Sequence, residues 1–142
     1  MKNKVLTISL IILVCITLIG VVALILVMQL NKGDAKETEP TIDEIIENSV
    51  DIEEITTNLV GKQFIRVSLK VQTDNKKAAE ELAKRDFQVK NIVIQELSEM
   101  TPQDLEGKIG KQALEDSIKS HLNPLMQSGE IEKVYIVSHI IQ

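Results

Sequence analysis

The stretch that decides the fold reads FIRVSLKVQ and spans residues 64–72. Apolar and polar side chains alternate through it without interruption. The apolar set is Ile65, Val67, Leu69 and Val71, and the polar set is Arg66, Ser68, Lys70 and Gln72. A period of two residues is typical of a strand that turns one face to the core. The polar face is expected to be solvated or to meet a partner.

The sequence before this strand predicts a β-hairpin. Residues 55–60 are a short β-prone run, and Gly61-Lys62-Gln63 then breaks it. Further upstream, residues 43–54 place isoleucines between acidic side chains, and Ile42, Ile45 and Ile46 have helical spacing. A short helix or an ordered lead-in is expected there.

The sequence after the strand predicts a long amphipathic helix. Asp74 or Asn75 is placed to cap it, and it is expected to end near Met100. Its apolar positions step by three, four or seven residues: Ala78, Leu82, Val89, Val93 and Leu97. The charged group Lys84-Arg85-Asp86 lies in its middle and is a candidate for a bend.

Thr101-Pro102-Gln103-Asp104 is a strong helix start, with threonine at the N-cap and an acid at the third helical position. Gly107 and Gly110 argue against a continuous helix. We expect one turn, a glycine-rich bend and a second helix from about Lys111, which Pro124 ends or kinks.

The last predicted strand is residues 133–142. It is apolar on both faces, which is usual for a strand in the centre of a sheet or covered on both sides. The predicted order of elements is β-β-α-α-β, which indicates an α+β domain.

Residues 5–30 are 26 consecutive residues without a charged side chain or a histidine. A helix of this length spans about 39 Å, against a hydrocarbon core of about 30 Å. The run is too long for a signal-peptide core and no convincing cleavage site follows it. We therefore expect an uncleaved transmembrane helix.

The predicted organisation has four parts. Residues 1–4 form a cytoplasmic tail, residues 5–30 the transmembrane helix, residues 31–53 a linker and lead-in, and residues 54–142 an extracytoplasmic domain. Basic residues nearly balance on the two sides of the helix, so the orientation rests on how easily a four-residue tail stays in the cytoplasm. The chain is thus expected in the cell membrane as a single-pass protein.

Charge and cysteine content narrow the function classes. The chain has 16 basic and 21 acidic residues, and without Lys2 and Lys4 residues 31–142 carry a net charge of −7. An acidic domain without interleaved basic and aromatic residues is a poor nucleic-acid binder. Cys15, the only cysteine, lies in the apolar run, so the domain holds together without a disulfide.

No common nucleotide-binding, hydrolase or metalloprotease motif occurs, and no cofactor is expected. His121 and His139 are most simply ordinary surface or half-buried residues. The adjacent acids Glu53-Glu54 and Glu80-Glu81 point to different faces, which is typical of solvated charge. The basic groups Lys76-Lys77 and Lys84-Arg85 are expected to be solvated or to meet an acidic partner or a neighbouring subunit.

Several short motifs follow the apolar run along the chain. Their positions are Asn58, Leu59 and Arg66 in the hairpin, Gly110, Lys111 and Leu114 at a helix start, then Asn123, Tyr135 and Gln142. In order and spacing they resemble the family of the flagellar basal-body-associated protein FliL. Phe87, Lys90-Asn91 and Pro124 depart from the family pattern.

The resemblance implies a non-enzymatic accessory protein of the flagellar motor. Such proteins lie in the cell membrane beside the stator units and support flagellar rotation, motility and chemotaxis. The resemblance also implies a domain similar to stomatin-type (SPFH) domains, and a homo-oligomeric ring around the stator.

Two other functions remain open from the residues alone. A membrane-anchored sensor or ligand-binding domain needs a pocket with convergent polar groups, and the low aromatic content does not favour one. An extracytoplasmic hydrolase would require His121 or His139.

Overall fold

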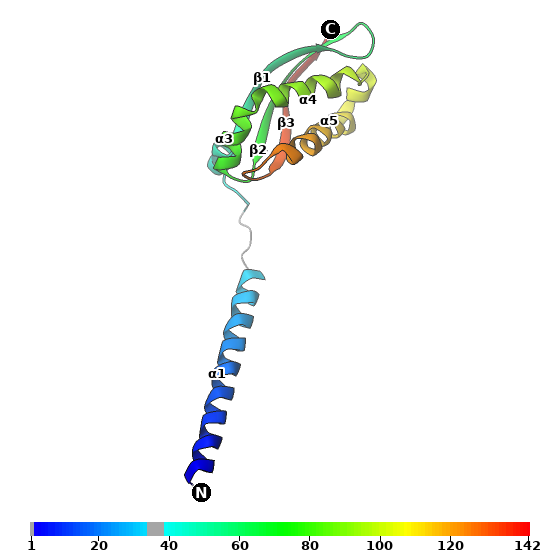
Figure 1. The fold of residues 1–142 in the computed structure, drawn as a ribbon. Helices are drawn as coiled ribbons and strands as arrows, with labels where there is room; N and C mark the ends of the chain where they lie inside the picture. Colours follow the sequence, from blue (N-terminus) through cyan, green and yellow to red (C-terminus); the bar gives the residue numbers. More distant parts are fainter. Residues whose placement is uncertain (1, 34–38) are drawn as a thin grey trace. The chain divides into compact units, whose positions relative to one another are not determined.

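The computed structural model describes residues 2–33 and 39–142, with side chains placed outside residues 29–38. The chain divides into two compact units, Met1–Pro40 and Thr41–Gln142 (Figure 1). The fold class predicted from the sequence is confirmed: the chain has an apolar N-terminal helix and an α+β unit with an antiparallel sheet.

The first unit consists of helix α1, Lys2–Gly33. Its segment Lys2–Met28 is long and apolar enough to cross a membrane, and it is the one such helix in the described part of the chain. Its large apolar side chains, from Val5 to Met28, are exposed. Apolar side chains are more stable in lipid than in water, and a helix can cross lipid because it satisfies its own backbone hydrogen bonds.

The second unit starts with the short helix α2, Ile42–Glu47. Thr41 and Glu44 form a reciprocal capping box: the Thr41 side chain accepts from the Glu44 amide, and the Glu44 carboxylate accepts from the Thr41 amide. The short helix expected in the lead-in is therefore present.

Three strands form one antiparallel sheet in the order β1-β2-β3: β1 is Ser49–Asn58, β2 is Phe64–Thr73 and β3 is Ile131–Ile141. The predicted hairpin is confirmed, although β1 begins at Ser49 rather than at Ile55. Gly61 allows the turn, with φ of 106°.

The prediction for the last strand was wrong, because β3 is an edge strand and β2 is the central one. The register of β3 against β2 shifts between Ile136 and Ser138, which marks a β-bulge at Val137. Beyond a bulge, the odd- and even-numbered residues of a strand exchange faces. Apolar residues at both odd and even positions of β3 therefore do not imply that both faces of the strand are covered. Val137 and Ile140 are in fact exposed.

The predicted long helix is two helices, α3 (Lys76–Lys84) and α4 (Asp86–Ser98), with Arg85 between them. The bend predicted at the charged group is confirmed. Asn75 is the N-cap, and its side-chain oxygen accepts from the Ala78 amide at 3.0 Å.

The 3₁₀ turn η1 (Pro102–Leu105) opens with the predicted capping box between Thr101 and Asp104. Helix α5 then runs Gly107–Leu122 and continues into the turn η2, Asn123–Leu125. It starts four residues earlier than expected, because Gly107, with φ of 68°, forms the bend by itself.

The core lies between one face of the sheet and the helices α3, α4 and α5, which lie on the same side of it (Figure 1). The alternating apolar residues of β2 are at its centre. Their partners on the helices are Leu82, Val89, Val93, Leu97, Leu114, Ile118 and Leu122. Each of these is at most 1% exposed. Within the second unit, residues 41–142, no helix covers the opposite face of the sheet.

Candidate interaction surface

The uncovered face of the sheet, called the open face below, carries the polar side chains of β2. Two ion pairs cross it from β2 to β1: Lys70 Nζ lies 2.9 Å from Asp51 Oδ1, and Arg66 Nε lies 3.7 Å from Glu54 Oε1. All four side chains are at least one-third exposed. Exposed ion pairs of this kind contribute little to folding stability. A partner that contacts this face can therefore rearrange them at little cost.

The end of the open face near the hairpin is hollowed and exposes two apolar side chains, Phe64 and Ile140. A shallow hollow of about 150 Å³ is lined by Thr56, Phe64, Ile65, Arg66, Ile140 and Gln142. Phe64 is 57% and Ile140 49% exposed. Exposed apolar side chains beside an arginine are common in protein contacts, whereas a hollow this small cannot enclose a small-molecule ligand.

The other end of the open face is closed by a polar network around Gln72. Tyr135 Oη donates to Gln72 Oε1 at 2.9 Å, and Gln72 Nε2 donates to Glu132 Oε2 at 2.7 Å. Lys133 Nζ lies 4.8 Å from the centre of the Tyr135 ring. This network joins β2 to β3 and explains how Gln72 is buried on a face that is otherwise open.

The nine motif positions all lie in the described part of the chain, and they do not converge on one site. Leu59 and Leu114 are core residues, at most 1% exposed. Gln142 exchanges both main-chain hydrogen bonds with Phe64, at 2.9 Å each. Arg66, Asn58 and Tyr135 lie on the sheet, and Lys111 is half-buried in α5.

Asn123 lies in η2 and positions Ile131, the first residue of β3. Its Oδ1 accepts from the Ile131 amide at 2.6 Å, and its Nδ2 donates to the Ile131 carbonyl at 3.3 Å. Ile131 is 1% exposed, so water cannot replace these partners. Pro124 lies in η2 directly after it.

Gly110 allows η1 to approach α5 closely. A Cβ atom at this position would lie 2.1 Å from the carbonyl oxygen of Asp104. The sequence predicted a helix-breaking role for Gly110, but the residue lies inside α5. Its function there is to leave room for backbone.

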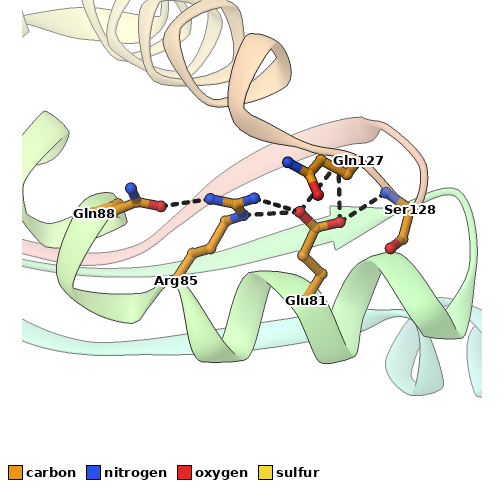
Figure 2. A network of polar contacts seen from close by, with 5 residues as sticks. All are labelled: Glu81, Arg85, Gln88, Gln127 and Ser128. Carbon is orange, nitrogen blue, oxygen red and sulfur yellow. Dashed lines mark hydrogen bonds and ion pairs between the residues drawn. The ribbon is translucent and has the colours of Figure 1, made fainter.

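Figure 2 shows a network that the sequence did not predict, centred on Glu81. Its carboxylate accepts from Arg85 Nε at 2.8 Å, from the Gln127 amide at 3.0 Å and from the Ser128 amide at 2.7 Å. Arg85 Nη1 also donates to Gln88 Oε1 at 2.8 Å. The network joins the end of α3 to the turn before β3.

The expectation that Glu81 is a solvated acid was therefore wrong: its side chain is 14% exposed. Burial raises the pKa of Glu81, but the bonds from Arg85 and the Gln127 and Ser128 amides outweigh it and lower the pKa to about 2. The spacing of Glu81 and Arg85, four residues apart on a helix, was the one signal in the sequence.

The two histidines do not form a hydrolytic site. His121 Nδ1 lies 3.3 Å from Glu96 Oε1, and Ser117 Oγ donates to the same carboxylate. The acid is thus between serine and histidine, whereas a nucleophilic serine needs histidine as its direct partner. His139 is exposed on β3 opposite Val67. Residues 2–33 and 39–142 contain no group of three metal-ligating side chains.

Comparison with known proteins completes this description. The model of the family "Flagellar basal body-associated protein FliL" matches residues 49–142. The chain belongs to the FliL family. It is also 45% identical over 111 residues to "Flagellar protein FliL" of Bacillus subtilis (strain 168), which covers 78% of this chain and 79% of that protein.

The FliL match begins at the first residue of β1 and includes the whole sheet with α3, α4 and α5. The open face and the Glu81 network therefore both lie within the region of this chain that the FliL model matches. The resemblance inferred from the order of the short motifs is confirmed, and the chain is assigned to the flagellar basal body as an accessory protein.

Proposed function

We propose that this FliL protein associates with the stator units of the flagellar motor and supports rotation, and through it motility and chemotaxis, without catalysing a reaction. Membership of the FliL family is the observation that carries the proposal. The open face supports it, because a half-exposed sheet with paired charges and an apolar end suits a protein contact.

The proposed topology places residues 1–4 in the cytoplasm, residues 5–30 in the membrane, residues 31–53 as linker and lead-in, and residues 54–142 outside. The apolar surface of α1 supports a single membrane crossing. Ten residues lie between Leu30 and Thr41, and the eleven steps from one residue to the next reach at most about 40 Å from the end of the crossing.

The domain is further proposed to resemble stomatin-type (SPFH) domains and to assemble as a homo-oligomeric ring. Its acidic composition supports contacts through specific faces rather than through the membrane surface, since anionic lipids repel it. Crosslinking in membranes at native expression should give oligomers, and a purely monomeric result would contradict this part.

The decisive experiment is deletion of the gene, followed by swimming and swarming assays and by co-purification of stator subunits with the tagged protein. Reduced motility and recovery of stator subunits are expected. Normal motility together with no stator association would refute the proposal.

Topology is tested separately with Ser138→Cys in a Cys15→Ser background. Ser138 is exposed on β3, so a membrane-impermeant maleimide should label it in intact cells. Labelling that requires lysis would place the domain in the cytoplasm.

A further inference from the structure

The outer edge of β3, which faces away from β2, consists of two unlike halves. In an antiparallel ladder, main-chain groups alternate between facing the partner strand and facing away. Phe64 and Gln142 exchange both hydrogen bonds and so face each other. Alternation along the register then turns the main-chain groups of Ile141 and His139 outward.

The first half of this edge is covered by side chains of α5 and η2. Three residues, spaced four apart and so on one side of the helix, bond to it. They are Glu115, which accepts from the Ile136 amide at 3.0 Å, Lys119, which donates to the Glu132 carbonyl at 2.8 Å, and Asn123, which bonds to both main-chain groups of Ile131. An edge protected in this way cannot accept another strand.

The second half, Val137–Ile141, is called the open edge. Among the described residues, no side chain bonds to the main chain of His139 or Ile141. Val137 is 64% and Ile140 49% exposed, and no residue of the open edge is an acid, a lysine or an arginine. It therefore lacks the charges that usually keep an edge strand from pairing.

The edge of β1 offers a complementary strand. Because Phe64 and Arg66 of β2 face β3, Ile65 and Val67 face β1, and their partners are Thr57 and Ile55. The main chains of Thr56 and Asn58 then face outward. No side chain in the described part of the chain bonds to them.

We propose that the open edge of one copy pairs with the β1 edge of a second copy, so that the sheet continues from subunit to subunit. This inference rests on the proposed homo-oligomer and names its contact surface. The contact joins two different surfaces of the chain, and a repeated contact of this kind closes into a ring when the rotation permits.

Strand direction favours this pairing over two β3 strands together. Strands β1 and β3 are both antiparallel to β2 and are therefore parallel to each other. Pairing β3 with β1 of the next copy keeps Thr41 of every copy at the same end of the extended sheet. Under the proposed topology all linkers then lead to one membrane, whereas an antiparallel pair of β3 strands would place the two Thr41 residues at opposite ends.

Charge disfavours the remaining combination, two β1 edges together. Asp51, Glu53 and Glu54 lie on β1 and are exposed. Two copies of this strand would bring their acids together, and although Asp51 and Glu54 each have a basic partner on β2, placing like charges opposite each other is destabilising. The uncharged open edge meets β1 without this repulsion.

The first test uses full-length chains in membranes in a Cys15→Ser background. One tagged chain carries Ser138→Cys and a differently tagged chain carries Thr56→Cys, since both positions are exposed on the two strands. A short bis-maleimide should link the two tags when the chains are co-expressed, and neither chain should link to itself. Linking of Ser138→Cys to itself, without the mixed product, would overturn the proposal.

The second test compares His139→Pro with His139→Ala. Proline removes the outward N–H but leaves the bonds to β2, because His139 does not face β2, while alanine keeps that N–H. The yield of the mixed crosslink should fall about tenfold in the proline variant and should be unchanged in the alanine variant. Equal crosslinking by both variants would show that the main chain of the open edge is not used.

Tyrosine fluorescence during urea unfolding checks that both His139 variants remain folded. If the proline variant does not fold, the crosslink between Thr56→Cys and Ser138→Cys still tests the interface. Lysine crosslinking of the unmodified chain separates the two levels of the inference. Oligomers without a link between Thr56→Cys and Ser138→Cys overturn this interface alone. The absence of any oligomer overturns the proposed ring as well.

Discussion

Replacing Gly110 by alanine tests whether close backbone approach, rather than helix breaking, explains this glycine. The new Cβ would lie 2.1 Å from the Asp104 carbonyl oxygen and 2.9 Å from its carbon. Both atoms belong to backbone, so no side-chain rotation relieves the contact. The turn η1 is also fixed by its capping box, with Asp104 Oδ2 2.7 Å from the Thr101 amide, and by buried Leu105.

Two opposing effects set the magnitude. Alanine in place of glycine inside a helix ordinarily stabilises by about 0.5–1 kcal/mol. Overpacking of a closely packed contact costs about 1–3 kcal/mol, and a contact more than 1 Å too short against fixed backbone belongs at or above the upper limit. We expect a net destabilisation of about 2 kcal/mol, or a melting temperature lower by roughly 10 °C for a unit of this size.

The full-length chain in detergent, unfolded by urea, is a suitable system. Tyr135 is the only tyrosine and the chain has no tryptophan, so tyrosine fluorescence reports the sheet without a signal from α1. Gln112→Ala is the matched control, because Gln112 is exposed on the same helix and its substitution changes little besides helix propensity. A Gly110→Ala variant at least as stable as the unmodified chain would refute the reasoning.

Three further predictions use the same assay. Asn123→Ala leaves the buried Ile131 amide without its acceptor and should cost about 1–3 kcal/mol, while Asn123→Asp keeps that acceptor and should cost less; equal losses would contradict this. Leu114→Ala should cost about 2–5 kcal/mol, since Leu114 is 1% exposed, and a loss below 1 kcal/mol would show that the core is not closely packed there. Because the pKa of Glu81 is about 2 in the folded chain and about 4.5 unfolded, its stabilisation is complete above pH 4.5 and is lost as the pH falls toward 2. The stability difference between Glu81→Gln and the unmodified chain should therefore shrink over that interval, and a constant difference would indicate that the charge of Glu81 is not involved.

The parts of the fold that the sequence predicted depend on neighbouring residues. The alternation of residues 64–72 is complete within one strand, and the capping box at Thr101 is complete within four residues. The bend at Arg85 likewise follows from a local charged group inside an apolar period. Each of these sequence patterns lies inside the turn or strand that it predicts. Tertiary contacts were therefore not needed to predict these elements.

The parts that the sequence did not predict depend on residues far apart. Strand β3 contains a bulge at Val137, and a period-two reading fails at any bulge because the faces exchange there. The partly buried Glu81 carboxylate accepts hydrogen bonds from the Gln127 and Ser128 amides, which are 46 and 47 residues away in the chain. A local sequence pattern therefore shows neither which face of the sheet each residue of β3 occupies nor what surrounds Glu81.

The same distinction applies to the motif positions. Leu59 and Leu114 fill the core, Gly110 admits the Asp104 carbonyl and Asn123 positions Ile131. All four of these residues serve the fold, and a side chain buried in the core cannot contact a partner.

Under the proposed function, recognition of the stator or of a neighbouring subunit then depends on exposed positions outside that buried set. The structure offers such places at the apolar end of the open face around Phe64, at the open edge (residues 137–141) and at the β1 edge around Thr56 and Asn58. Substitutions there should change association while leaving stability nearly unaltered, because surface residues away from buried networks usually contribute less than about 0.5 kcal/mol. Substitutions at the buried motif positions should change both together, so measuring stability and association in the same variants separates residues that build the domain from residues that connect it to the motor.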